Sequence, residues 1–271
     1  MEERKYTADE VAAAFGTLAK EVSFLGTGAF GETWRIGPQD ACKIIYQDDF
    51  PAERLDREVE GLLKIEDDRV VRLRERTAVV IEGCMRQVLR FEFIPGGDLR
   101  RRLNQGQVPA EECVALTRGL LHAAAVLHEA QVVHRDIKPE NILLRHGEPA
   151  DPVLVDLGLV KPLDESTLTV YPSFIGTARY AAPEQLRGDR ARNAADLWSI
   201  GAVAAEALTG RHPYSQPGQH RDFATLLRAA ESVDLDLPAD TPSELRIVIA
   251  KLLSPRRSAR GSARTAERML A

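Results

Sequence analysis

The spacing of apolar residues changes at positions 95–98 (PGGD), and this change limits the possible folds more than any other feature of the chain. Before it, short runs of β-forming residues lie beside glycine turns, at 21–37, 41–46, 77–83 and 86–94. After it, longer segments carry apolar residues at helical spacing, at 110–130, 195–210, 220–231 and 242–254. One helical pattern, 52–65, also lies in the first part. The sequence therefore predicts an α+β fold, with a small sheet and one main helix followed by a larger, mostly helical part.

The composition is that of a globular protein. The chain has 271 residues, of which 44% are hydrophobic and 28% charged, and its net charge of −5 gives no case for nucleic-acid binding. The cysteines Cys42, Cys84 and Cys113 are far apart, so neither a zinc site nor a disulfide framework is expected. The charged N-terminus and the lack of an apolar run of about 18 residues predict no signal peptide and no membrane span. We expect a cytoplasmic, reducing environment.

A glycine-rich stretch, GTGAFG, occupies positions 26–31. A dinucleotide-binding turn with this pattern must lead into a helix, but the following residues alternate as in a strand. The glycines then belong to a hairpin whose backbone N–H groups can approach phosphates without interference from Cβ atoms. An ordinary glycine-rich turn explains the stretch equally well.

A lysine, Lys43, stands inside the apolar run ACKII, where a cation is either solvated at a sheet edge or paired. Glu58 on the helical pattern 52–65 is a candidate partner, and Glu60 is its rival on a different face. A Lys–Glu pair would position the ammonium group for an anionic ligand. Two solvated surface charges are the alternative.

The stretch 132–144, VVHRDIKPENILL, concentrates an acceptor, a cation and an amide. Asp136 could accept a proton from a hydroxyl, Lys138 could stabilise a charged transferring group, and Asn141 could bind a divalent cation through its amide oxygen. A second acid, Asp156, follows an apolar run in VLVDLGL. Oxygen ligands such as Asn141 and Asp156 suit Mg²⁺ bound to phosphates, and phosphoryl transfer needs these groups.

Taken together and in order, these motifs resemble those of the eukaryotic-type (Hanks-type) protein Ser/Thr kinases, a family also found in bacteria. The resemblance covers nearly the whole chain. It rests on GTGAFGET, ACK, HRDIKPEN, DLG in place of the usual DFG, GTARYAAPE and DLWSIG. Ala and Arg are abundant and Lys is sparse, which indicates only a GC-rich genome, and from the resemblance we expect a bacterial member of the family.

The resemblance implies a bilobal kinase fold with an N-terminal extension at 1–20, an N-lobe at 21–94 and a C-lobe at 95–271. It also implies transfer of the γ-phosphate of ATP, with Mg²⁺, to Ser or Thr residues of protein substrates. Asp136 would be the catalytic base, Lys138 the γ-phosphate contact, and Asn141 and Asp156 the Mg²⁺ ligands. Thr177 would contact the catalytic Asp and Lys, whereas His134 would have a packing role.

The same resemblance implies the ATP-binding residues. The phosphates would lie near Gly26, Gly28 and Gly31, and Lys43 would contact them while paired with Glu58. The backbone of Glu92 and Ile94 would read adenine, and Asp98 would face the ribose. Thr33, Ala41 and Leu143 would sandwich the adenine ring.

Regulation and specificity follow from the resemblance in the same way. We expect autophosphorylation at Thr167 or Thr169, in a transient homodimer if it occurs in trans, with Arg135 binding the phosphate. Asp98, Glu140 and Glu206 match an acidic patch that would favour basic residues before the acceptor. Glu184 should pair with Arg260, or alternatively with Arg257.

Two other functions share parts of this pattern. A pseudokinase, acting as an ATP-binding regulatory module, usually lacks the Lys, Asp or Asn, but Lys43, Asp136, Asn141 and Asp156 are all present here. A small-molecule phosphotransferase usually lacks a segment like GTARYAAPE. A protein substrate is therefore expected.

Overall fold

The structure is a computed structural model. It describes residues 4–28, 31–46, 59–60, 62–157, 178–215 and 222–271. The chain divides into two compact units, residues 1–94 and 95–271. Each is described separately below.

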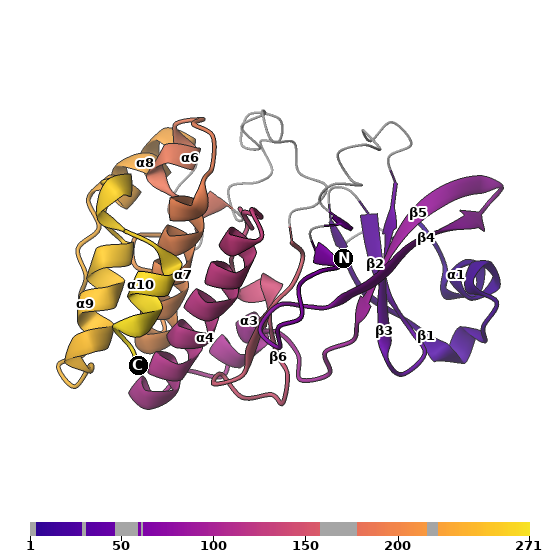
Figure 1. The fold of residues 1–271 in the computed structure, drawn as a ribbon, viewed down its shortest axis with the longest axis horizontal. Coiled ribbons are helices and arrows are strands. Elements are labelled where there is room, and N and C mark those ends of the chain that lie inside the picture. The colour runs from indigo at the N-terminus through magenta and orange to yellow at the C-terminus, as the bar shows by residue number, and fades with distance from the viewer. Residues whose placement is uncertain (1–3, 29–30, 47–58, 61, 158–177, 216–221) are drawn as a thin grey trace. The chain divides into compact units, whose positions relative to one another are not determined.

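The first unit is built on one antiparallel sheet with the strand order β1-β2-β3-β5-β4 (Figure 1). Its strands are β1 Val22–Gly28, β2 Gly31–Ile36, β3 Asp40–Ile45, β4 Leu73–Ile81 and β5 Cys84–Glu92. Strands that are neighbours in sequence pair as β1–β2, β2–β3 and β4–β5, and β5 also pairs with β3, so it lies between β3 and β4. The expected strand-rich part is therefore confirmed.

Alternation along the central strands gives the sheet two chemically different faces. On one face, Trp34, Cys42 and Ile44 have no solvent exposure and form a core cluster with Val88. Thr33 and Lys43 are paired directly opposite each other, so both point to the other face. One face of the sheet thus packs against the core, and the other carries Thr33 and Lys43, two of the expected ATP-binding residues.

Residues expected to form an N-terminal extension contribute to this core. Helix α1 (Ala8–Phe15) begins with a capping box, in which Thr7 and Glu10 bond each other's backbone N–H groups, and ends at Gly16 with φ 63°. Val11 and Tyr6 are 0% and 2% exposed and belong to the same cluster as Trp34. The helix expected at 52–65 lies mostly outside the described residues.

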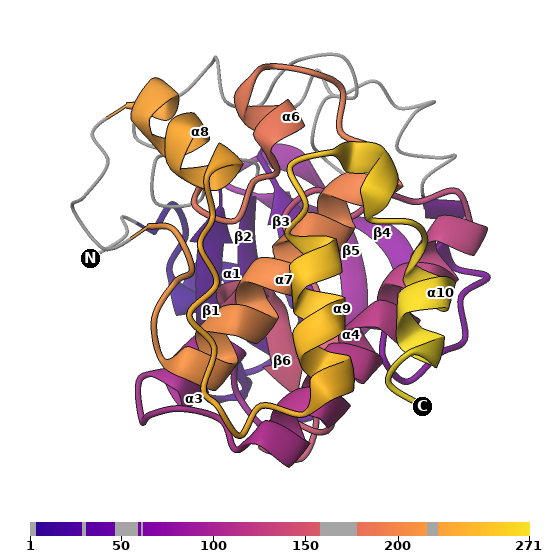
Figure 2. The same cartoon turned by 90° about the vertical axis from the view of Figure 1, so that its left-hand side faces the viewer.

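The second unit is mostly helical (Figures 1 and 2). The α-helices among its described residues are α3 Leu99–Leu103, α4 Ala110–Glu129, α6 Pro183–Leu186, α7 Asn193–Thr209, α8 Phe223–Glu231, α9 Ser243–Leu252 and α10 Ala263–Arg268. Helix α7 packs against α4 and α9, and α10 packs against α4. A Cβ on Gly201 of α7 would lie 2.8 Å from Cβ of Leu252, so glycine permits the close approach of α7 and α9. The expected helical part is confirmed.

A small irregular region carries the stretch 132–144. It includes the 3₁₀ turn η2 (Pro139–Asn141) and a two-stranded sheet of β6 (Ile142–Leu144) and β7 (Pro152–Leu154).

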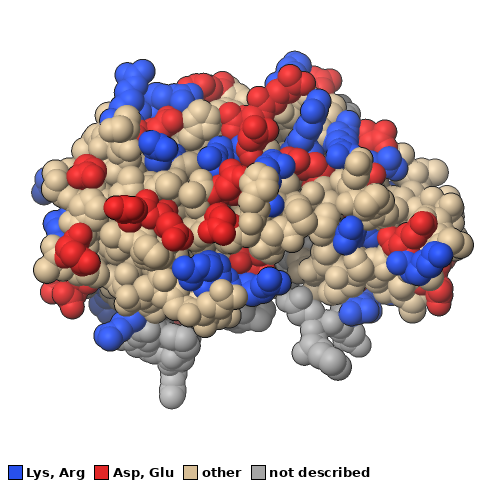
Figure 3. Space-filling view, turned by 90° about the horizontal axis from the view of Figure 1, so that it is seen from below, with Lys and Arg blue, Asp and Glu red and all other residues tan. Residues whose placement is uncertain are grey.

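Lysine and arginine are interspersed with aspartate and glutamate on the face drawn in Figure 3. Among the described residues, no helix is long and apolar enough to cross a membrane.

Candidate active site

The carboxylate of Asp136 is the centre of the polar cluster predicted from the sequence. Nζ of Lys138 lies 3.1 Å from its Oδ2. The side-chain amide Nδ2 of Asn141 donates to the same Oδ2 at 3.1 Å and to the backbone carbonyl of Asp136 at 2.9 Å. The structure therefore brings Asp136, Lys138 and Asn141 together. One carboxylate oxygen is fixed between a cation and an amide donor.

Asn141 also connects this loop to Asp156. Its backbone carbonyl accepts the N–H of Val155 at 3.0 Å, which extends the β6–β7 ladder by one pair. Asp156 comes next along the chain and has φ 57°, an uncommon value for a residue other than glycine. Asp156 thus leaves the strand with a sharp change of direction beside Asn141.

These two side chains fit a hard divalent cation. The amide nitrogen of Asn141 is used by Asp136, which leaves the amide oxygen as its ligand atom. Among the described residues, no three His, Cys, Asp or Glu side chains form a metal-binding group. Mg²⁺ needs no such cage, since it keeps several waters and uses one or two protein oxygens with substrate phosphates.

A buried aspartate on α7 holds the loop in place. Asp196 has no solvent exposure, and its Oδ1 accepts the backbone N–H of Arg135 at 2.8 Å. Its Oδ2 accepts the N–H of His134 at 2.9 Å and lies 2.8 Å from Nε2 of His128. Arg135 has φ 67°, so these bonds maintain an otherwise unfavourable backbone turn just before Asp136.

The donors around Asp196 also determine its charge. Burial raises the pKa of this carboxyl, but the hydrogen bond and charge of His128, with the neighbouring donors, outweigh burial and lower the pKa below its ordinary value of 3.8. Asp196 is therefore ionised at neutral pH despite complete burial.

His134 has the packing role expected for it. The side chain has no solvent exposure. Its Nδ1 accepts the backbone N–H of Asp136 at 3.3 Å, and its Nε2 lies 2.9 Å from the carbonyl oxygen of Val155. This pattern requires the proton on Nε2, so the ring is a structural bridge and not a proton acceptor for substrate.

In the first unit, the glycines of the 26–31 stretch differ in their surroundings. A Cβ on Gly31 would collide with the backbone carbonyl oxygen of Ile44, so the pairing of β2 with β3 requires glycine there. Among the described residues, no atom lies within 4 Å of the corresponding point at Gly26, and only one, at 4.0 Å, lies near that of Gly28. These two glycines therefore have room for a ligand.

The other ATP-binding candidates of the first unit lie on or after β2, β3 and β5. Lys43 pairs with Thr33 on one side and Leu89 on the other, and Ala41 pairs with Phe91. The N–H of Glu92 is used by the carbonyl of Arg72 at 3.0 Å. Within the described part of the chain, the backbone N–H of Ile94 has no acceptor.

In the second unit, Asp98 forms an isolated bridge with Leu143, which brings these two candidates side by side. The carboxylate of Asp98 accepts the N–H of Arg101 at 2.8 Å and caps α3. Glu58 and Thr177, with Thr167 and Thr169, lie outside the described residues.

Glu184 pairs with Arg260, and the first of the two alternatives is confirmed. Nη1 and Nη2 of Arg260 lie 2.7 and 2.9 Å from the two carboxylate oxygens, in a fully buried bidentate contact. Arg260 also donates to the carbonyls of Ser254 and Ala194. The pair ties α6 to the segment after α9.

Two of the three acids expected to form an acidic patch are bound by an arginine of the chain itself. Glu140 and Glu206 do lie together, but both bind Arg100 of α3, each at 2.9 Å. Arg100 could not be singled out from the sequence, because it stands in the run LRRRL, where three arginines look alike. His128 could not be identified either, because no motif relates its position to that of Asp196.

Comparisons with known proteins agree with this geometry. Residues 19–269 match the protein kinase domain family. The chain is 35% identical over 239 residues to the inhibitor of nuclear factor kappa-B kinase subunit beta of Rattus norvegicus, covering 80% of this chain and 30% of the rat protein. It is 34% identical over 180 residues to the serine/threonine-protein kinase PknL of Mycobacterium tuberculosis, covering 65% of this chain and 43% of PknL.

Among solved structures, Rad53 1-466 in complex with AMP-PNP superposes with a TM-score of 0.71 and 28% identity, covering 93% of this chain and 66% of that chain. Of the two curated relatives, the rat protein and PknL, the matched region covers only 30% and 43%, so this chain spans less than half of their length. The family match nevertheless extends over almost all of its own length, and it includes both the five-stranded sheet and the stretch 132–144. The chain belongs to the protein kinase domain family.

Proposed function

We propose that this chain is a protein Ser/Thr kinase that transfers the γ-phosphate of ATP to serine or threonine hydroxyls of proteins. The observation that carries the proposal is the arrangement around Asp136, whose Oδ2 lies 3.1 Å from both Nζ of Lys138 and Nδ2 of Asn141. The family match and the relatives that are named Ser/Thr kinases support the same reaction.

In the proposed reaction, the substrate hydroxyl donates its proton to Asp136 while its oxygen forms a bond to the γ-phosphorus. The bond from the γ-phosphorus to the β–γ bridging oxygen breaks, and its electron pair leaves with ADP. Lys138 neutralises negative charge on the phosphoryl group in transfer. Thr177 is proposed to contact Asp136 and Lys138.

Asn141 and Asp156 would hold Mg²⁺. When bound, the ion neutralises phosphate charge and orients the transferring group. The amide oxygen of Asn141 fits this role because Asp136 engages the amide nitrogen of the same side chain.

For ATP, Gly26, Gly28 and Gly31 are proposed to lie near the phosphates, with Lys43 as a phosphate contact paired with Glu58. The open space beside Gly26 and Gly28 supports this assignment. Adenine is proposed to meet Thr33, Ala41 and Leu143 and the backbone of Glu92 and Ile94, and the ribose to meet Asp98. The N–H of Ile94, which has no acceptor among the described residues, suits a purine nitrogen.

Autophosphorylation at Thr167 or Thr169, through a transient homodimer, is proposed to order the activation segment, which lies between Asp156 and Glu184. Arg135 would contact the phosphate. A cytoplasmic location is also proposed, since all three cysteines are free thiols, as expected in a reducing compartment. The contacts of Arg100 with both Glu140 and Glu206 argue against the preference for basic substrates that the acidic residues alone would favour.

The test is to treat the purified protein with phosphatase, remove the phosphatase, and add ATP and Mg²⁺. Intact mass is then followed for the wild type, Asp136→Asn and the exposed control Asp240→Asn. Added phosphate in the wild type and control, with a loss of about 10²-fold or more in Asp136→Asn, is the expected result.

If no phosphate is added to the protein or to a generic basic protein, while ATP still binds, the proposal fails in favour of a non-catalytic ATP-binding module. Mapping the phosphates tests the two threonines separately. Active enzyme without modification of either Thr167 or Thr169 would contradict the activation-segment proposal alone.

A further inference from the structure

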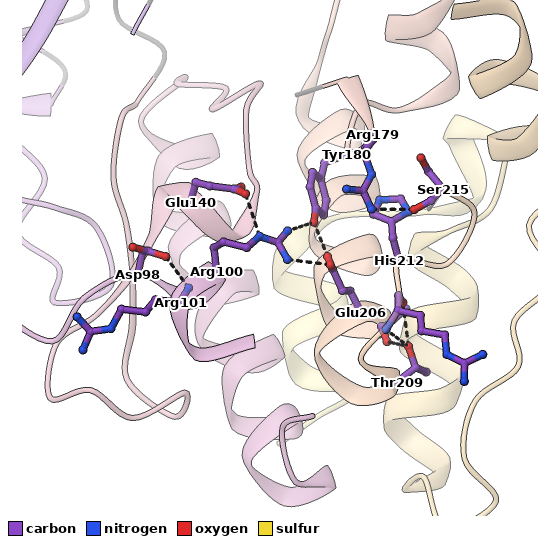
Figure 4. Close-up of polar contacts among 12 residues, drawn as sticks. Asp98, Arg100, Arg101, Glu140, Arg179, Tyr180, Glu206, Thr209, His212 and Ser215 are labelled. Carbon is purple, nitrogen blue, oxygen red and sulfur yellow. Dashed lines mark hydrogen bonds and ion pairs between the residues drawn. The ribbon is translucent and has the colours of Figure 1, made fainter. Parts of the chain in front are cut away.

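The guanidinium group of Arg100 is held by three side chains from three separate segments (Figure 4). Its Nε donates to Glu140 at 2.9 Å, on the turn that follows Asp136. Its Nη1 donates to Glu206 of α7 at 2.9 Å, and its Nη2 donates to the hydroxyl of Tyr180. All three guanidinium nitrogens are therefore used by partners within the chain.

Tyr180 closes this arrangement. Its hydroxyl donates to the second carboxylate oxygen of Glu206, and its side chain is buried. Burial, followed by the charge of Glu206, raises the pKa of Tyr180, so the hydroxyl keeps its proton and remains a donor. Arg100 and Tyr180 together satisfy both oxygens of Glu206.

The charges of the cluster do not cancel. Glu140 and Glu206 contribute two negative charges, and Arg100 supplies one positive charge. The Glu206 side chain is 9% exposed, whereas those of Arg100 and Glu140 are 25% and 47% exposed. Without Arg100, the nearly buried carboxylate of Glu206 and the half-exposed carboxylate of Glu140 would have no contacting cation among the described residues.

This pair lies close to the proposed phosphate acceptor. Glu140 follows Asp136 by four residues, and the two are at most about 14 Å apart along an extended chain. A peptide whose hydroxyl reaches Asp136 can therefore bring another of its side chains, within about four residues, to Glu140. The guanidinium of a substrate arginine would seek the same two carboxylates that Arg100 already binds.

We propose that Arg100 is a specificity-determining residue, which fills the Glu140–Glu206 carboxylate pair from within the chain and denies it to a substrate arginine. The inference rests on the proposed kinase activity. The wild type gains no selectivity for arginine from this pair, although its acidic residues resemble a basic-selective site. Removing the Arg100 charge opens a subsite for arginine.

The experiment compares Ser-containing peptides that carry either Arg or Ala at each of the four positions on both sides of the acceptor. The kcat/KM ratio, Arg over Ala, is measured for the wild type, Arg100→Gln and Arg101→Gln. Arg101 is the matched control, because it is the exposed neighbour of Arg100 on the same helix.

In the wild type and Arg101→Gln, the ratio should stay within about twofold of unity at every position. In Arg100→Gln it should rise about tenfold or more at one position, the size expected for a hydrogen bond between charged groups. Adding Glu140→Gln to Arg100→Gln should return the ratio to unity. An equal fall in kcat for all peptides would show a purely structural role and overturn the inference.

A second measurement does not depend on catalysis. Ethylguanidinium should raise the melting temperature of Arg100→Gln more than ethylammonium does, and should not discriminate in the wild type or in Arg101→Gln. No difference in Arg100→Gln overturns the inference. If the wild type phosphorylates no peptide at all, the proposed function fails, and this melting experiment still tests Arg100.

If Arg100→Gln does not fold, the inference is tested by the peptide kcat/KM ratios of the single variant Glu140→Gln. Because Arg100 already occupies Glu140, this single change should leave the peptide ratios of the folded enzyme unchanged. A wild-type preference for arginine that Glu140→Gln abolishes would show that substrates use this carboxylate and would overturn the inference.

Discussion

Two carboxylates without solvent exposure, Glu32 in the first unit and Asp196 in the second, each hold an irregular segment against a regular element. Asp196 on α7 accepts the backbone N–H groups of His134 and Arg135 in the stretch 132–144. Glu32 on β2 accepts the backbone N–H of Lys5 in the N-terminal segment and the indole N–H of Trp34 at 3.0 Å.

The two acids differ in what they support. Asp196 gathers donors from the loop that carries Asp136, so it positions the proposed chemistry. Glu32 follows Gly31 and docks the N-terminal segment on the face of the sheet opposite Lys43. Burial, followed by the hydrogen bond with Glu32, raises the pKa of Tyr46, which joins the same contact. A buried acid thus anchors loop backbone in each unit, whether or not that loop carries a catalytic motif.

The largest effect is expected from Asp196→Ala. It leaves the N–H groups of His134 and Arg135 and the ring of His128 without their acceptor, which should lower the free energy of unfolding by about 3–5 kcal/mol. Denaturant unfolding measures this loss. The exposed Asp240→Ala should stay within about 0.5 kcal/mol of wild type, and an equally small effect at Asp196 would contradict the anchoring role.

The Asp196 contribution should also depend on pH. Its folded-state pKa lies below the ordinary 3.8, so its stabilising effect is present above pH 3.8 and is lost as the pH falls towards the folded-state pKa. The stability difference between wild type and Asp196→Ala should therefore be constant near neutrality and shrink below pH 3.8. A difference that shrinks well above this pH would mean that another group carries it.

A smaller effect is expected from Glu32→Ala, which leaves the N–H of Lys5 and the indole of Trp34 unsatisfied. The free energy of unfolding should fall by about 1–3 kcal/mol. Because β2 begins at the proposed phosphate-contacting Gly31, KM for ATP should rise more than kcat falls. A fall in kcat without a rise in KM would mean that Glu32, like Asp196, supports the reacting groups and not the strand that begins at Gly31.

The smallest change is in thiol reactivity, which reports on each unit separately. Cys84 is exposed, whereas burial raises the pKa of Cys42 on β3 to about 11 and that of Cys113 on α4 to about 12. A thiol reagent should label Cys84 rapidly and the other two only when their unit opens. Glu32→Ala should speed labelling of Cys42 first, and Asp196→Ala that of Cys113. If Glu32→Ala exposed Cys113 first, or Asp196→Ala exposed Cys42 first, each buried acid would not stabilise its own unit as proposed.

Much of the architecture was predictable from local patterns. The strand pattern at 86–94 corresponds to β5 at Cys84–Glu92, and the helical pattern at 195–210 corresponds to α7 at Asn193–Thr209. The partner of Glu184 was narrowed to two arginines by motif order. Such features depend on periodicity and on the spacing of a few chemically distinct residues, both of which can be read along the chain.

Local patterns along the chain predict the α+β fold and the order of the kinase motifs, including the cluster of Asp136, Lys138 and Asn141. Only the folded structure shows that Arg100, and not Arg101 or Arg102, binds Glu140 and Glu206. It likewise shows that Tyr6 packs in the core beneath the sheet and that the backbone of Lys5 bonds to Glu32. The physical reason is that secondary structure follows local periodicity, whereas the partner of a charge depends on which distant segments the folded chain brings together.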